Sequence, residues 1–249
     1  MNMNKKKVGT IAMVILLIAV AGIYIGINCW KNRKIEFADE NMAKVICSSI
    51  YGYGGDVTPE NVTWEELDSI ETLDIGYSGY YSTIKDIPKC RNLKRLDINN
   101  MLSKDDAAYQ IANGKIEKIL SVDDVERLEK ELAQVLPELP ELKEIHLADL
   151  GNCEWTSVDF LRGCNHLEEL RLYSSTASDY SALKKCKLLK ILLLWDCNIS
   201  SAEDIIGIEN LEYIGLSDTP LDQDSTEVQK LREAYPNVDI DIKKPSKKK

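Results

Sequence analysis

The stretch Leu189-Lys-Ile-Leu192-Leu-Leu194-Trp-Asp-Cys197-Asn-Ile199 contains a pattern, Leu-x-x-Leu-x-Leu, that recurs along most of the chain. A single unit of this kind cannot bury its own apolar edge, whereas stacked units form a continuous core. The recurrence therefore predicts a solenoid, an architecture that usually presents a binding surface. The second aliphatic residue of successive units falls at Leu73, Leu96, Ile119, Ile145, Leu170, Leu192 and Ile214, at intervals of 23, 23, 26, 25, 22 and 22 residues.

The third unit, Ile116–Ser121, is degenerate, and we include it because the gap between Leu96 and Ile145 is otherwise two periods long. Helical returns are expected between the strands, the longest over Asp123–Leu136, where apolar residues are spaced for one helix face. The later returns are shorter and are expected to be single helical turns, near Val158–Leu161, Tyr180–Leu183 and Ile205–Ile208.

The two ends of the repeat array also carry structural signals. Asp39–Ile50 reads as an amphipathic helix, and Thr58 followed by Pro59 reads as the N-cap of a second, short helix. At the other end, a last helix is expected over Ser225–Tyr235. The alternation in Val238–Ile242 predicts a closing edge strand.

These residues resemble the leucine-rich repeat family. The fifth unit, Leu189–Ile199, matches L-x-x-L-x-L-x-x-N/C-x-I throughout, and Phe37–Asn41 with Asp56–Glu60 is similar to the helical cap of bacterial, internalin-like members. The resemblance implies an α/β fold: a right-handed solenoid with a parallel β-sheet on its concave face and a helical N-terminal cap. The chain departs from the family in lacking an L-P-x-T-G sorting signal, and the asparagine/cysteine position holds Met101, Ser175 and Thr219 in other units.

The N-terminal region is separate from the repeats. Lys5–Lys7 precede an uncharged stretch, Val8–Ile27, of 20 residues, which as a helix would span roughly 30 Å and match a bilayer core. We expect one transmembrane helix that anchors the chain. A cleaved signal peptide is the alternative; a lipidated Cys29 fits less well. Basic residues flank the apolar stretch on both sides, so the charge bias hardly decides the orientation of the helix in the membrane. Because the segment after the helix is large and the tail before it is short, we expect the repeats to lie outside the cell.

The sequence thus divides into six expected segments. They are a cytoplasmic basic tail at 1–7, the membrane anchor at 8–30, a linker at 31–36, the helical cap at 37–69, the repeats at 70–242 and a disordered basic tail at 243–249.

Charge is distributed unevenly. The segment Ile35–Ile242 holds all 41 acidic residues of the chain. Of the 31 basic residues, six precede this segment and five follow it, which leaves 20 within it and gives it a net charge of −21. Such a domain is a poor partner for nucleic acid. Among seven cysteines, Cys90, Cys164 and Cys186 each lie three residues before a repeat's first leucine, where Ile208 stands in a later unit. This interchange with isoleucine predicts core thiols, not disulfides.

Motifs for catalysis or cofactor binding are few. The two histidines, His146 and His166, lack a metal-ligand spacing such as H-E-x-x-H and are expected to be surface imidazoles. Glu144 and Glu169 fall on neighbouring strands, but on an open face they lack the enclosure that separates the pKa values of a catalytic pair. We therefore expect that the chain is not an enzyme and that it binds neither a cofactor nor a metal ion.

Strand alternation instead places a patch on the concave face. Charged side chains, Arg95, Glu144, Glu169 and Arg171, occupy its first half. Apolar and aromatic side chains occupy the second half, where Tyr173, Trp195 and Tyr213 are expected as anchors above a floor of Ile191 and Leu193. This patch predicts non-catalytic binding of a protein or peptide at the bacterial cell surface. A structural, self-associating protein of the cell envelope, a homo-oligomer, is the alternative.

Overall fold

The computed structural model describes residues 13–23, 26, 34–51, 58–75, 81–98, 122–148, 157–173 and 175–243. Several predictions concern residues outside these ranges. They are the basic tail at 1–7, Cys29, Met101, the strand at Ile116–Ser121, Cys153 and the tail after Lys243.

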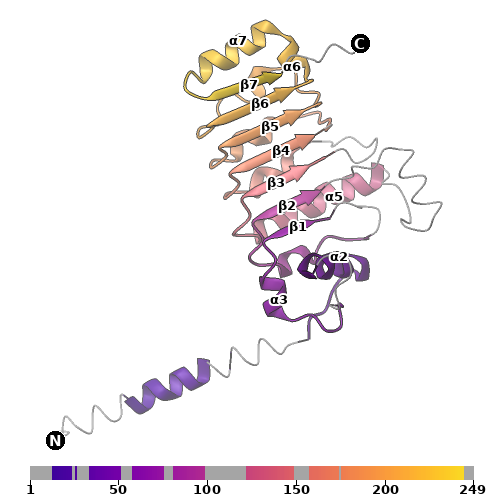
Figure 1. The fold of residues 1–249 in the computed structure, drawn as a ribbon, viewed down its shortest axis with the longest axis vertical. Coiled ribbons are helices and arrows are strands. Elements are labelled where there is room, and N and C mark those ends of the chain that lie inside the picture. Colours follow the sequence, from indigo (N-terminus) through magenta and orange to yellow (C-terminus); the bar gives the residue numbers. More distant parts are fainter. Residues whose placement is uncertain are drawn as a thin grey trace, which may run out of the picture.

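Seven parallel strands form one sheet in which neighbours in space are neighbours in sequence (Figure 1). This order means that each connection returns along the same side of the sheet to start the next strand, as expected for a solenoid. The strands are β1 (Thr72–Asp74), β2 (Arg95–Ile98), β3 (Glu144–Leu147), β4 (Glu169–Tyr173), β5 (Ile191–Trp195), β6 (Tyr213–Ser217) and β7 (Asp239–Lys243).

The register aligns the same aliphatic position of every strand. Leu96 pairs with Leu73 and Ile145, Leu192 pairs with Leu170 and Ile214, and all are buried. Because side chains alternate along a strand, this row and the row two residues later face the core together. The predicted α/β repeat solenoid is therefore confirmed for these strands.

The strand predicted at Ile119 lies outside the described residues, and the described sheet leaves no strand between Leu96 and Ile145. β2 pairs directly with β3, with Leu96 opposite Ile145, so the sheet has no place for a further strand there. The long amphipathic helix α5 (Val122–Val135) instead belongs to this connection, and it buries Val125, Leu128 and Leu132.

The other connections are short, as predicted. They cover the core face of the sheet with 3-10 turns at equivalent places, each of which buries one or two apolar side chains. These turns are η1 (Ile87–Lys89), η3 (Asp159–Gly163), η4 (Ser181–Lys185) and η5 (Ala202–Asp204), and a further turn, η2 (Leu136–Glu138), follows α5 in the connection from β2 to β3. After β6, the helices α6 (Pro220–Gln223) and α7 (Ser225–Ala234) precede the closing strand.

The N-terminal cap consists of the helices α2 (Glu40–Tyr51) and α3 (Trp64–Asp68), which lie beside the first strand of the sheet (Figure 1). α2 buries Met42 and Ile46, and the short helix α3 buries Leu67. The prediction of Thr58 as the N-cap of α3 is wrong. Thr63 caps it, and Glu66 completes a reciprocal capping box, whereas Thr58 and Pro59 lie in the turn before the helix.

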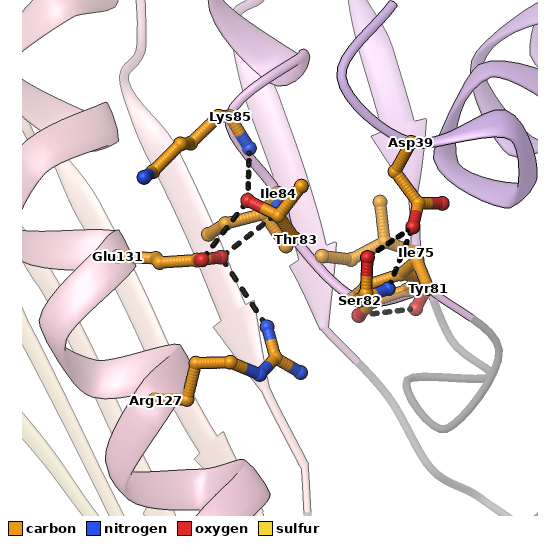
Figure 2. Close-up of polar contacts among 9 residues, drawn as sticks. All are labelled: Asp39, Ile75, Tyr81, Ser82, Thr83, Ile84, Lys85, Arg127 and Glu131. Carbon is orange, nitrogen blue, oxygen red and sulfur yellow. Dashed lines mark hydrogen bonds and ion pairs between the residues drawn. The ribbon is translucent and has the colours of Figure 1, made fainter.

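The segment between β1 and β2 is held from two sides (Figure 2). From the cap, the Asp39 carboxylate accepts hydrogen bonds from the Ser82 amide at 2.8 Å and the Ser82 hydroxyl at 2.6 Å. From α5, Glu131 accepts from the Thr83 hydroxyl at 2.9 Å and the Ile84 amide at 2.8 Å. Cap, first repeat and α5 are thus joined by buried or half-buried carboxylates.

Of the predicted membrane anchor at 8–30, the structure describes residues 13–23 and Gly26, and residues 13–23 are helical. The apolar side chains of this helix are exposed. Within the described ranges, no helix combines the length and the apolar character needed to cross a bilayer.

Replacing Glu131 tests the link between α5 and the first repeat. Glu131→Ala leaves the buried Ile84 amide without its acceptor, so the free energy of unfolding should fall by about 2 kcal/mol in urea denaturation. Gln134→Ala, an exposed position on the same helix, is the control and should change it by less than about 0.5 kcal/mol. Equal stability of the two variants would contradict the role of this carboxylate.

The cysteines give a second test. Burial raises the thiol pKa to about 12 at Cys90 and Cys164, and to about 11 at Cys186 and Cys197. Because the thiolate is the reactive form, these thiols should resist iodoacetamide at pH 8 in the native protein and react after unfolding in urea. Peptide mass spectrometry measures the labelling of each site. Rapid native labelling, or disulfide-linked peptides containing these residues, would contradict the prediction of core thiols.

Candidate binding surface on the open face of the sheet

The sheet face opposite the 3-10 turns, here called the open face, corresponds to the predicted concave surface. In-register pairing arranges its side chains in rows that cross the strands. The first row is Arg95, Glu144, Glu169, Ile191, Tyr213 and Asp239; the second is Asp97, His146, Arg171, Leu193, Gly215 and Asp241; the third includes Tyr173, Trp195 and Ser217.

The half of this face on β2–β4 is a chain of ion pairs. Arg95 binds Asp97 through two nitrogens, at 3.0 and 2.8 Å. The Asp97 carboxylate also lies 2.9 Å from Nδ1 of His146, while Arg171 binds Glu169. Burial alone would raise the pKa of Asp97, but the hydrogen bonds from His146 and Arg95 outweigh it and hold this pKa below its ordinary value.

The prediction of His146 as a surface imidazole is wrong. Only 7% of the residue is exposed. Its neighbours in the same row are Asp97 on β2 and Arg171 on β4, so a charged residue flanks His146 on each adjacent strand. The sequence pattern placed His146 on the correct face but did not show that this face is crowded enough to bury it.

The half on β4–β6 is aromatic and apolar. The rings of Tyr173 and Trp195 meet edge to face, with centroids 5.0 Å apart and planes at 69°. Trp195 is 36% exposed, the largest exposure of any described Trp or Tyr side chain on this face. Ile191 and Tyr213 are half-buried in the first row. The patch is therefore an aromatic edge with one indole open to solvent.

Leu193, predicted as part of an accessible apolar floor, is less accessible than expected, because only 8% of the residue is exposed. Gly215, its neighbour on β6, makes the burial possible: a Cβ there would lie 2.4 Å from Cδ2 of Leu193. The leucine thus occupies the space that a side chain at position 215 would need, and the Tyr213 ring borders the same space. Tyr213 in turn donates a hydrogen bond to Asp241 at 3.2 Å.

The structure therefore divides the nine predicted site residues into two groups. Arg95, Glu144, Glu169 and Arg171 lie around His146, and Tyr173, Ile191, Leu193, Trp195 and Tyr213 lie on the next strands. Sequence reasoning missed Gly215 and Asp241 as parts of this surface, and it placed His146 on this face without giving it a role. Their position in the strand alternation was the available signal, since each is in register with a residue already placed on the open face.

Comparison with known proteins finds similar solved structures only. No protein-family model matches the chain, and no curated protein does. Solved structures do match: an internalin of Listeria monocytogenes is 20% identical with a TM-score of 0.42, over 75% of this chain and 53% of that one. The resemblance is to leucine-rich repeat proteins of the bacterial internalin type.

Two further structures are similar. Internalin C2 of the same organism is 21% identical with a TM-score of 0.30, over 72% of this chain and 94% of that one. A leucine-rich repeat protein of Leptospira interrogans is 18% identical with a TM-score of 0.39, over 71% and 38%. The chain thus spans about half of the first internalin. At these identities the likeness extends to the fold alone.

A pair of substitutions tests how deeply the two side chains on the open face of β5 are packed. Leu193→Ala removes a buried side chain and should lower the free energy of unfolding by about 2–3 kcal/mol. Trp195→Ala removes a partly exposed ring and its edge contact with Tyr173, so the loss should be about 1 kcal/mol. Urea denaturation measures both. A greater loss for Trp195→Ala than for Leu193→Ala would show that the indole belongs to the core.

Proposed function

We propose that this chain is a non-catalytic binding module that recognises a protein or peptide on the open face of its sheet. The observation that carries the proposal is the edge formed by Tyr173 and Trp195, whose indole is exposed beside the half of the sheet face that is filled by paired charges. Trp and Tyr dominate the binding energy of protein interfaces, where they anchor in pockets of the partner. A leucine-rich repeat surface supplies such anchors from a rigid scaffold.

The charges around the aromatic edge indicate the chemistry of the partner. Asp196 and Asp218 follow β5 and β6, and Asp239 and Asp241 lie on β7; all four are exposed. With a net charge of −21 over Ile35–Ile242, this surface favours a partner segment in which lysine or arginine flanks an apolar side chain. It repels polyanions such as nucleic acids.

The same geometry argues against catalysis by Glu144 and Glu169. A general acid needs a carboxyl group kept protonated by an apolar, enclosed site. Glu169 instead binds the Arg171 guanidinium, and Glu144 is only half-buried. The pair is better suited to holding cations than to donating a proton.

Display at the bacterial cell surface is part of the proposal. Its support is the uncharged stretch Val8–Ile27 and the exposed apolar side chains of residues 13–23, which would anchor the chain in the membrane with the repeats outside. The competing function is a structural envelope protein in which the aromatic edge contacts a second copy of the chain.

Selection from a random-peptide library tests recognition directly. Peptides enriched on the purified protein should contain an apolar residue next to basic residues. Trp195→Ala should weaken their binding by about 2 kcal/mol or more, roughly thirtyfold, in calorimetry. Leu188→Ala, which removes an exposed apolar side chain from the turn before β5, is the matched control and should leave affinity unchanged.

Enriched peptides that bind the wild type and Trp195→Ala equally would place recognition elsewhere. Sedimentation equilibrium of the same proteins separates the competing function. A wild-type dimer that Trp195→Ala converts to a monomer would favour self-association over capture of a foreign peptide.

A further inference from the structure

His146 is held in an unusual environment on the charged half of the open face. Only 7% of His146 is exposed to solvent, and the Nδ1 atom of its ring lies 2.9 Å from the Asp97 carboxylate. Its other nitrogen, Nε2, is buried and has no hydrogen-bond partner among the described residues. The nearest charged atom recorded for Nε2 is Oε1 of Glu169, at 3.5 Å.

The partner of Nδ1 fixes the chemistry of Nε2. A carboxylate only accepts hydrogen bonds, so Nδ1 carries the proton and donates it to Asp97. In the neutral ring Nε2 then presents a lone pair, and it points toward further carboxylates, which are also acceptors. A buried lone pair facing negative oxygens is unfavourable unless a cation lies between them.

The surrounding carboxylates have the geometry of a cation site. One carboxylate oxygen of Glu144, one of Glu169 and one ring nitrogen of His146 all lie within 4.8 Å of one another. Ligands about 2.1 Å from a tetrahedral zinc ion are roughly 3.4 Å apart. The separation of 3.5 Å between Nε2 and Glu169 already has this value, so small side-chain rotations would close the set.

We propose that Glu144, His146 and Glu169 bind a divalent transition-metal ion of the zinc class, with Asp97 as the outer carboxylate that orients the imidazole. One imidazole and two carboxylates form a donor set that zinc accepts. A histidine ligand that donates its second N–H to a carboxylate is the usual outer-shell arrangement of such sites. The remaining coordination position faces the open side of the sheet, where water or a donor from a partner can reach it.

Local charge supports a cation at this place. Asp97, Glu144 and Glu169 carry three negative charges, against two positive charges on Arg95 and Arg171. With a neutral imidazole the cluster is therefore left with one negative charge. Arg171 is already bound to Glu169, which fixes that carboxylate beside His146 but also competes for its oxygen. The alternative occupant of Nε2 is a proton, which would convert the cluster into a metal-free chain of ion pairs from Arg95 to Arg171.

Zinc titration of the full chain separates the two occupants. The protein is treated with a chelator, dialysed and titrated with zinc chloride against a chromophoric competitor. One equivalent should bind, and Glu144→Gln should weaken binding at least about tenfold while its amide keeps the shape of the side chain. Asp97→Asn should weaken it by about 10- to 100-fold through the imidazole. The other histidine provides the matched control, since His166→Ala should bind zinc as the wild type does.

Cobalt substitution identifies the ligands independently of affinity. Bound Co²⁺ should show ligand-field absorption without the intense thiolate-to-metal charge transfer that cysteine ligands produce. Circular dichroism confirms that each variant is folded, and Glu144→Gln carries the test if His146→Ala unfolds. The proposal is overturned if no zinc binds at 25 °C, if Glu144→Gln and Asp97→Asn bind as tightly as the wild type, or if the cobalt spectrum shows thiolate ligation. These outcomes do not depend on peptide binding at Trp195.

Discussion

The in-register stacking of parallel strands is the constraint on which the rest of this structure depends. Because Leu73, Leu96, Ile145 and Leu170 are paired in one row, each strand buries its aliphatic residues against those of its neighbours. The same register aligns the alternate residues on the other face. One geometric rule therefore produces both a dry core and an ordered array of surface side chains. A one-residue slip of any strand would exchange the two sets.

The rows explain why chemistry on the open face comes from residues far apart in the sequence. Asp97 and His146 are 49 positions apart, yet they are direct partners because β2 and β3 are neighbours in the sheet. Leu193 and Gly215 meet for the same reason. A large residue in one strand is accommodated by a small residue in the next, and a base in one strand is held by an acid in the next. The strand pairing, not local motifs, creates these combinations.

This dependence separates what the sequence could predict from what it could not. The spacing of Leu96, Leu170 and Leu192 was sufficient to predict strands, core and the open face, because those features follow from local periodicity. The strand predicted at Ile119 has no place between β2 and β3, because spacing alone cannot distinguish a weak repeat from a longer connection. The burial of His146 and Leu193 depends on the sizes of residues in adjacent strands, which are known only when the register is known. Thr63 was missed as a cap because Thr58-Pro59 carried the stronger local signal.

The two proposed sites share one face but are electrostatically almost independent. His146 lies on β3 and Trp195 on β5, so two strand spacings, about 10 Å, separate their backbones. A unit charge at this distance in water contributes roughly 0.4 kcal/mol, and salt reduces it further because the Debye length is about 8 Å under physiological conditions. A metal ion at Glu144, His146 and Glu169 would therefore change peptide affinity at the aromatic edge only slightly. Direct coordination of the ion by the partner would couple the two sites more strongly. A partner long enough to span β3 to β6 could supply the remaining ligand of the metal ion and bind both sites at once.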